Sequence, residues 1–154
     1  MSAALHLADL GDLDRLDPLV AAYHAVEGID SDANHRRAAL TPLLEGSPLG
    51  CVYMIGPQRS PVGYIALSFG WSIEFGGMDG FIDEFFIRET VRGRGMGSEV
   101  LARLLPELDA AGIRALHLEM DVNRTRLERL YIKAGFKLRD GYHLMTRTSR
   151  TQRA

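Results

Sequence analysis

The pattern with the most chemical content in this sequence is a run of alternating glycines. It comprises Arg92, Gly93, Arg94, Gly95, Met96, Gly97 and Ser98. Glycines lack a Cβ atom, so backbone N–H groups in such a loop can approach a bound group closely. Because a helix is expected to begin here, its dipole adds positive charge at the same place. We therefore predict an anion site suited to a pyrophosphate, with Arg88, Arg92 and Arg94 as mobile cations at its rim. A plain connector with solvated arginines is the alternative.

Two other phosphate-binding motifs fit this loop less well. A Walker loop needs a Gly-Lys pair followed by Ser or Thr, which the run lacks. A dinucleotide fingerprint needs a third glycine where Ser98 stands, and an acidic residue about 20 positions later, for which Glu119 is the candidate. However, five residues separate Ile87 from Gly93, so the turn is not tight, and fewer than forty residues follow Glu119. A dinucleotide-binding module therefore remains a minor alternative.

The elements around the loop follow from apolar periodicity and breaker residues. Phe81–Ile87 predicts a strand before it, and a helix is expected from about Gly97 to Ala111, with a kink or weakened turn at Pro106. A further strand and a short helix should follow, over Ala115–Met120 and Arg124–Ala134.

The remaining chain predicts both helices and hairpin strands. Asp12 is expected to cap a helix that ends at Gly28, and a second helix should run from about Asp32 to Leu44. The Gly-rich stretch Trp71–Gly80 favours neither state. This order mixes hairpins with a strand–helix–strand crossover, which indicates an α/β fold with a mixed sheet covered by helices. The expected strands here are Leu5–Ala8, Cys51–Ile55, Val62–Phe69, Phe136–Leu138 and His143–Thr146.

Length and composition fit one domain, expected over residues 1–147, with a polar tail over 148–154. The net charge of −2 gives no nucleic-acid signature. A lone cysteine, Cys51, lies in an apolar run and favours a buried residue and a reducing compartment. The five histidines show no metal-ligand spacing, so we predict no metal site. Since neither a signal peptide nor a membrane span is visible, we expect a cytoplasmic protein without a membrane partner.

Taken together, these residues resemble the GNAT family of N-acetyltransferases. Its pyrophosphate loop, Arg/Gln-x-x-Gly-x-Gly/Ala, is filled by Arg92, Gly95 and Gly97. The later segments Leu118-Glu119-Met120 and Leu130-Tyr131…Gly135-Phe136 are similar to a second block of the family. The resemblance covers about Phe81–Leu138.

The resemblance implies a bent, mixed sheet of roughly six to seven strands with about four helices. Two central parallel strands would splay apart to form a cleft for acetyl-CoA. The pantetheine arm would pair with the strand that ends in Phe85, Phe86 and Ile87, and a backbone N–H near Phe85 would polarise the acetyl carbonyl. The family usually has an asparagine where this chain has Arg124. Either Asn123 reaches the cofactor through a shifted loop, or Arg124 meets the phosphates instead.

Amine acetylation needs a neutral amine, a stabilised oxyanion and a protonated leaving thiolate. The resemblance points Tyr131 at the sulfur of CoA, where a phenol with an ordinary pKa of about 10 could act as general acid. Glu84 and Glu119 compete as general base, with a slight preference for Glu84 because it should lie near the acetyl group. Glu84 also stands among apolar residues, where a charge is costly unless it is used or paired. For either carboxylate, an ion pair with a neighbouring arginine is the plain alternative.

Four more carboxylates are candidates for binding a cationic amine substrate, namely Glu27, Asp30, Glu74 and Asp79. A polyamine, an aminoglycoside or a protein amine would suit them, and solvated surface carboxylates are the alternative. The expected function is therefore direct acetyl transfer from acetyl-CoA to a primary amine. A non-catalytic acyl-CoA-binding or sensing domain of the same fold is the second hypothesis. The family also makes a homodimer an open possibility.

Overall fold

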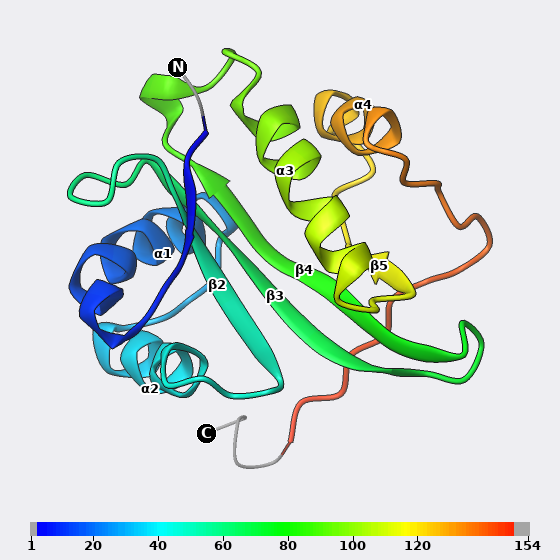
Figure 1. The fold of residues 1–154 in the computed structure, drawn as a ribbon, viewed down its shortest axis with the longest axis horizontal. Coiled ribbons are helices and arrows are strands. Elements are labelled where there is room, and N and C mark those ends of the chain that lie inside the picture. The colour runs from blue at the N-terminus through cyan, green and yellow to red at the C-terminus, as the bar shows by residue number, and fades with distance from the viewer. Residues whose placement is uncertain (1–2, 150–154) are drawn as a thin grey trace.

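Five strands form one mixed sheet, in the spatial order β1-β2-β3-β4-β5 (Figure 1). The computed structural model describes residues 3–149. Neighbouring strands are antiparallel from β1 to β4, whereas β5 runs parallel to β4. The expected count of six to seven strands is therefore wrong for the described residues. The strands are β1 (Leu5–Leu7), β2 (Gly50–Ile55), β3 (Gly63–Ser72), β4 (Gly77–Ile87) and β5 (Ala115–His117).

Four α-helices accompany the sheet in the described chain: α1 (Leu13–Glu27), α2 (Ala33–Leu44), α3 (Met96–Ala110) and α4 (Thr125–Lys133). Asp32 caps α2, because its side chain accepts a hydrogen bond from the N–H of His35 at 2.8 Å. Asp12 makes no such bond to α1; instead Asp9 caps a short 3-10 helix, Leu10–Asp12, that leads into it. Within residues 3–149, no helix is long and apolar enough to cross a bilayer.

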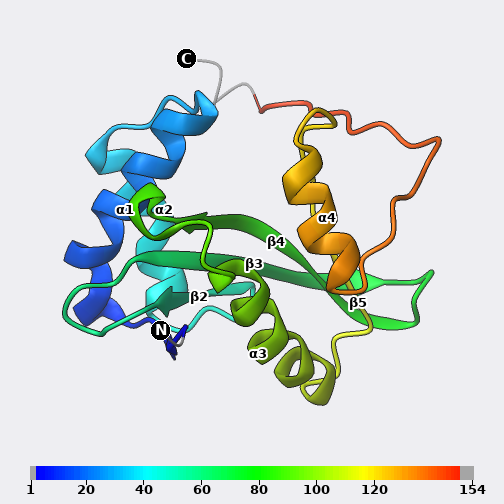
Figure 2. The ribbon, with the colours of Figure 1, turned by 90° about the horizontal axis from the view of Figure 1, so that it is seen from above.

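Two apolar cores hold the helices to opposite faces of the sheet. Alternate strand residues divide between them, since Val52 and Met54 pack with α1 and α2 whereas Ile55 packs with α3. The buried positions of α3 recur at helical spacing, and the helix runs unbroken through Pro106. Figure 2 shows α1 and α2 together at one end, with α3 and α4 at the other. The buried residues of α3 are Met96, Val100, Leu101, Leu104 and Leu108.

A hairpin and a bulge shape the two long strands. The Gly-rich stretch Trp71–Gly80 belongs to this hairpin, with β3 reaching Ser72 and β4 beginning at Gly77. The register then shifts, since Ala66 faces Glu84 while Leu67 faces Ile82. Asp83 is therefore left without a partner, as in a β-bulge. The bulge changes which face of β4 the following side chains occupy.

The contact between β4 and β5 is short. Only three residue pairs join them, ending at Phe81 and His117. The chain beyond His117 was expected to continue as a strand to Met120, and it does not. From Ile82 to Ile87, β4 therefore has a strand partner on its β3 side alone among the described residues. This divergence creates the space in which the candidate site lies.

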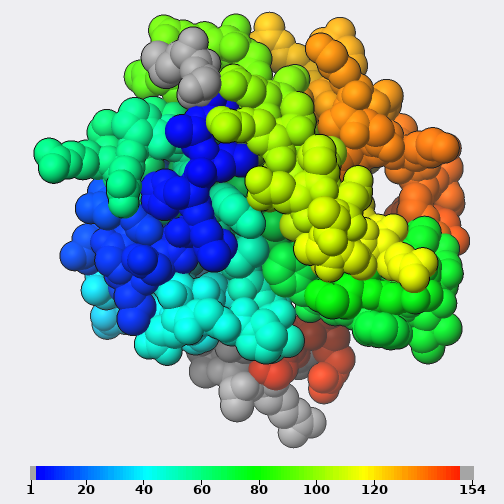
Figure 3. Space-filling model, in the orientation of Figure 1, coloured from blue at the N-terminus to red at the C-terminus, as the bar shows by residue number. Residues whose placement is uncertain are grey.

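The described chain after α4 contains no helix or strand, so the strands expected over Phe136–Leu138 and His143–Thr146 are wrong. Phe136 packs against the core that contains α3, but Leu138, Leu144 and Met145 are 59%, 67% and 91% exposed. Arg139 ties the segment to the β3–β4 turn instead, pairing with Glu74 at 3.0 Å and lying over Phe75. Figure 3 shows open space between this orange-to-red segment and the body of the molecule. With only three residues, β5 offers this segment little edge to pair with.

A substitution at Gly63 tests how closely β3 and β4 must approach. A Cβ atom there would lie 2.2 Å from the carbonyl oxygen of Phe86, which is backbone and cannot swing away. Gly63→Ala should therefore lower the free energy of unfolding by about 1–3 kcal/mol in a urea titration. Gly11→Ala is the matched control, since its Cβ would meet only the Asp9 side chain, and it should stay within about 0.5 kcal/mol. Equal stability of the two variants would contradict the register.

Candidate functional site

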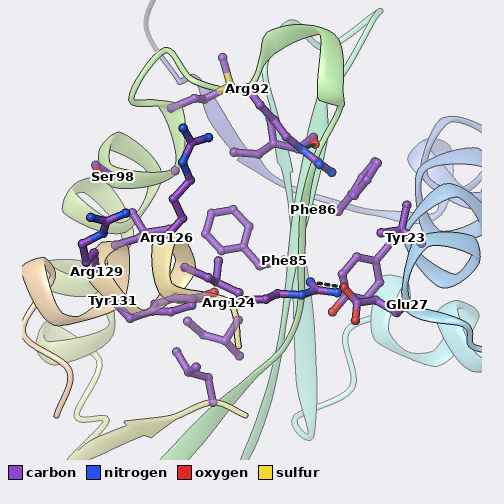
Figure 4. A pocket seen from close by; sticks show the side chains of 18 of the residues that line it. Tyr23, Glu27, Phe85, Phe86, Arg92, Ser98, Arg124, Arg126, Arg129 and Tyr131 are labelled. Carbon is purple, nitrogen blue, oxygen red and sulfur yellow. Dashed lines mark hydrogen bonds and ion pairs between the residues drawn. The ribbon is translucent and has the colours of Figure 1, made fainter. Parts of the chain in front are cut away.

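A cleft of about 760 Å³ opens where β4 and β5 diverge (Figure 4). Its walls come from segments far apart in the sequence: the end of α1, the second half of β4, the glycine loop with the start of α3, and the start of α4. The fold therefore brings the predicted loop, strand and tyrosine to one place.

The glycine loop forms one end of the cleft. Gly93 and Gly95 have φ angles of +78° and +73°, a region that favours glycine. Gly95 is also the N-cap of α3, and no side chain caps this helix end. The first N–H groups of α3 are thus left without a side-chain acceptor, as an anion site requires. The loop residues that line the cleft are Arg92, Gly93, Gly95, Met96, Gly97 and Ser98, whereas Arg94 does not.

Three arginines surround this end of the cleft. Arg92 donates a hydrogen bond from Nε to the carbonyl oxygen of Ile87 at 2.6 Å, and its guanidinium lies over the Phe86 ring. Arg126 and Arg129 come from α4 and also line the cleft (Figure 4). Neither Arg126 nor Arg129 was predicted to belong to the site. Their spacing of three residues, which places both on one helix face, was the available signal.

The second half of β4 forms the floor. Phe85, Phe86 and Ile87 all line the cleft. Figure 4 shows Phe85 near its middle, while Phe86 points toward α1. Because no strand pairs with this side of β4 in the described chain, its backbone can offer hydrogen bonds to an extended ligand.

Tyr131 brings a buried phenol into the cleft. The residue is only 6% exposed. Phe136 packs against the ring edge-on at 5.4 Å. Burial, with a smaller contribution from Tyr23, raises the pKa of Tyr131 to about 12. The hydroxyl group is therefore protonated at neutral pH and can donate a proton or a hydrogen bond.

Three carboxylates line the cleft, namely those of Asp83, Glu119 and Glu27. Asp83 is the bulged residue of β4, a position the sequence analysis placed on the strand without assigning it a role. Although its side chain reaches the solvent of the cleft, burial raises its pKa, and the charges of Glu84 and Glu119 add to this. A raised pKa brings a carboxylate closer to the range in which a general base works.

Glu84, the preferred base in the sequence analysis, does not line the cleft. One carboxylate oxygen accepts a hydrogen bond from the Tyr64 hydroxyl at 2.8 Å, and the other lies 2.7 Å from Nε2 of His24. The bulge accounts for this placement, because it turns Asp83 rather than Glu84 toward the cleft. The alternative prediction for Glu84, that it pairs with a neighbouring side chain, is therefore correct, but its partners are His24 and Tyr64 rather than an arginine.

An ion pair crosses the cleft from α1 to α4. Arg124 donates from its guanidinium to Glu27 at 2.6 Å, and both residues line the cleft with Asn123 and Tyr23 (Figure 4). Arg124, which occupies the family's asparagine position, is thus directed at Glu27 in this structure. The pair raises the pKa of Arg124 further.

The other predicted substrate residues are not brought together. Glu74 pairs with Arg139, and Asp79 lies 3.4 Å from His117. Asp30 is exposed after α1, and none of the three lines the cleft. Cys51 also lies elsewhere, and burial raises the pKa of its thiol to about 11, which opposes a nucleophilic role. Within residues 3–149, no group of three or more metal-ligating side chains is found.

Comparisons with known proteins agree with this geometry. A model of the acetyltransferase (GNAT) family matches residues 17–136. An integron cassette protein from the Cole Harbour salt marsh metagenome, HFX_CASS3, is 32% identical, with a TM-score of 0.80, over 94% of this chain and 89% of that one. A search of curated proteins finds no match.

More distant solved structures share the fold. A ribosomal-protein-alanine N-acetyltransferase from Brucella melitensis biovar Abortus 2308 is 17% identical, with a TM-score of 0.75, over 96% of this chain and 100% of that one. The aminoglycoside acetyltransferase meta-AAC0020 from an uncultured soil sample is 12% identical, with a TM-score of 0.76, over 96% and 97%. The family match covers most of the chain, and the cleft holds the loop, strand edge and tyrosine expected of it. The chain belongs to the GNAT acetyltransferase family.

Proposed function

We propose that this protein transfers an acetyl group from acetyl-CoA directly to a primary amine. One observation carries the proposal: the uncapped start of α3, the unpaired side of β4 and the buried Tyr131 phenol all open into one cleft. These features offer an anion site for the pyrophosphate of CoA, a backbone edge for its pantetheine arm and a proton donor for its thiolate.

The residues of the cleft fit CoA at each of its parts. The N–H groups after Gly95 and the positive end of α3 suit the pyrophosphate. Arg126 and Arg129 supply cations for the remaining phosphate, and the free side of β4 suits the amide groups of the pantetheine arm. When bound, the thioester supplies an activated acetyl group, and it needs no covalent help from the chain.

The chain's own groups then cover the needs of acyl transfer. A backbone N–H near Phe85 would stabilise the oxyanion of the tetrahedral intermediate. Asp83 or Glu119 would take the proton of the amine, directly or through a water molecule. Tyr131 would donate its proton to the departing thiolate, which restores a neutral thiol. We favour Asp83 over Glu119 as base because it lies on β4, two residues before Phe85. Glu84 is the weaker candidate, because both of its oxygens have partners.

The acceptor is proposed only as a class. Asp83, Glu119 and Glu27 give the acceptor side of the cleft its carboxylates, which favours a cationic amine such as a polyamine, an aminoglycoside or a protein amine. An acetyl-CoA assay across such amines, read by release of free thiol, tests the proposal. Tight CoA binding without turnover on any amine would instead favour the non-catalytic acyl-CoA-binding domain.

Gly95→Val tests the anion cradle. A valine at φ +73° is strained, and its side chain would stand in open space at the N-terminus of α3. CoA affinity measured by calorimetry should fall by at least about tenfold. Gly112→Val is a matched control, because Gly112 also has a positive φ (+90°) and open surroundings but lies at the other end of α3. If both variants bind CoA equally well, the cradle assignment is wrong.

Tyr131→Phe tests the general acid. Thiol release at saturating acetyl-CoA should slow by about tenfold or more, because the phenylalanine cannot protonate the thiolate, while the Kd for CoA stays nearly unchanged. Tyr142→Phe serves as the control, since Tyr142 is 73% exposed and lies outside the cleft. An unchanged kcat in Tyr131→Phe would remove the acid assignment.

Asp83→Asn tests the base through both rate and stability. The raised pKa of Asp83 means that ionisation costs more in the folded chain than in the unfolded one. Its contribution to stability is therefore present below its unfolded pKa and is lost as the pH rises through its folded pKa. Compared with the wild type, Asp83→Asn should therefore have a higher free energy of unfolding at neutral pH, and this difference should shrink at acid pH. The rate of amine acetylation should fall.

The control for this variant is Asp14→Asn on the surface of α1, where the side chain is 88% exposed. It should leave the rate, and the pH dependence of both measurements, close to those of the wild type. Full activity of Asp83→Asn together with loss of activity in Glu119→Gln would transfer the role of base to Glu119.

A further inference from the structure

A continuous chain of hydrogen bonds lies outside the cleft, where α1 meets β4. Ser31 Oγ is 2.7 Å from Nδ1 of His24, and Nε2 of His24 is 2.7 Å from Oε2 of Glu84. The other oxygen of Glu84, Oε1, accepts from the Tyr64 hydroxyl at 2.8 Å. None of these four residues lines the cleft. The proposed acetyl transfer uses none of them.

The buried end of this chain determines where its protons lie. Tyr64 is 0% exposed, and burial together with the charge of Glu84 raises the pKa of its hydroxyl group, so the group keeps its proton and donates it. Glu84 is therefore an acceptor on both oxygens, and Nε2 of His24 must carry the proton that it donates to Oε2. In the neutral form of the imidazole, this tautomer has its lone pair on Nδ1. That lone pair faces the hydroxyl group of Ser31.

This arrangement meets the geometric test for an activated nucleophile. A hydroxyl group lies within hydrogen-bond reach of a base, and a third group orients that base. Burial increases the effect, because the side chains of His24 and Glu84 are only 11% and 19% exposed. Ser31 itself is partly exposed to solvent.

The backbone around Ser31 is held in place by Arg36. Arg36 donates to the carbonyl oxygen of Ser31 at 2.7 Å and to Asp17 at 2.7 Å, which fixes the loop between α1 and α2. Ser31 directly precedes Asp32, the N-cap of α2, so the first turn of that helix follows the nucleophile.

We propose that Ser31, His24 and Glu84 form a second reactive site, which takes an acyl group from small activated esters and hydrolyses it. Ser31 Oγ attacks the ester carbonyl while its proton passes to Nδ1 of His24. The bond from the carbonyl carbon to the leaving oxygen then breaks, and the leaving oxygen departs with the electron pair and takes the proton from Nδ1, so an alcohol or phenol is released. In the second half, water attacks the acyl-serine carbonyl and gives one proton to Nδ1 of His24. The bond to Oγ breaks, His24 passes that proton to Oγ, and a carboxylic acid is released. Glu84 is a positioning residue, since it acts through His24.

The test uses p-nitrophenyl acetate without CoA, so that its outcome is independent of the proposed acetyl transfer. Mass spectrometry of peptides from the full chain should find one acetyl group on Ser31, and nitrophenol release should fall by about a hundredfold in Ser31→Ala and in His24→Gln. Ser47→Ala is the matched control, because the Ser47 hydroxyl accepts only from the N–H of Leu49. CoA binding and thermal unfolding confirm that each variant is folded.

Glu84→Gln tests whether Glu84 positions His24 for reaction or only stabilises the fold. The titratable groups around His24 are Glu84, Asp83, Tyr23 and Tyr64. Removing the charge of Glu84 disfavours the imidazolium, so the acid limb of the pH–rate profile should move to lower pH as the rate falls. An unchanged profile would overturn the role of Glu84. Acetylation of Ser31 no faster than that of Ser47, or one that persists in His24→Gln, would overturn the site.

Discussion

The divergence of β4 from β5 is the constraint on which the rest of the structure depends. Three parallel residue pairs hold the strands together, and beyond Phe81 they separate. A sheet interior must satisfy its backbone groups, so a strand with one open side is costly unless a ligand, water or another segment covers it. In this chain the opening is where the glycine loop, α4 and the end of α1 meet. Each of these contributes to the cleft only because β5 turns away.

The bulge at Asp83 is the second consequence of that geometry. It divides neighbouring carboxylates between two environments, with Asp83 in the cleft and Glu84 in a closed hydrogen-bond network. A regular strand would also place them on opposite faces, but the bulge decides which of the two faces the cleft. The cleft is divided in charge as well. Arginines gather near the start of α3, and the carboxylates lie toward α1 and β5.

The elements with strong local signals could be predicted from the sequence. Alternating glycines before an amphipathic stretch located the loop and α3, and the capping Asp32 located α2 to within one residue. The register between β3 and β4 could not be read from the sequence, because a bulge leaves no periodic trace. Glu84 was therefore assigned to the cleft in place of Asp83. Arg126 and Arg129 were missed since surface arginines on a helix usually face solvent.

The strands predicted in the C-terminal segment were wrong for a different reason. Leu144 and Met145 belong to the predicted strand His143–Thr146, yet they are 67% and 91% exposed. A run of apolar residues forms a strand only where it can pair with the edge of a sheet, and the edge strand β5 is only three residues long. Instead of pairing with the sheet, the segment is held by Arg139, which forms an ion pair with Glu74 and lies over the Tyr142 ring.

The ion pair between Glu27 and Arg124 joins α1 to α4, two helices that flank opposite sides of the cleft. With side chains 25% and 42% exposed, such a pair contributes on the order of 1 kcal/mol or less, and salt screens it. Thermal motion is therefore enough to part the two charges. A ligand that enters the cleft can therefore separate Glu27 from Arg124 at a small cost in free energy.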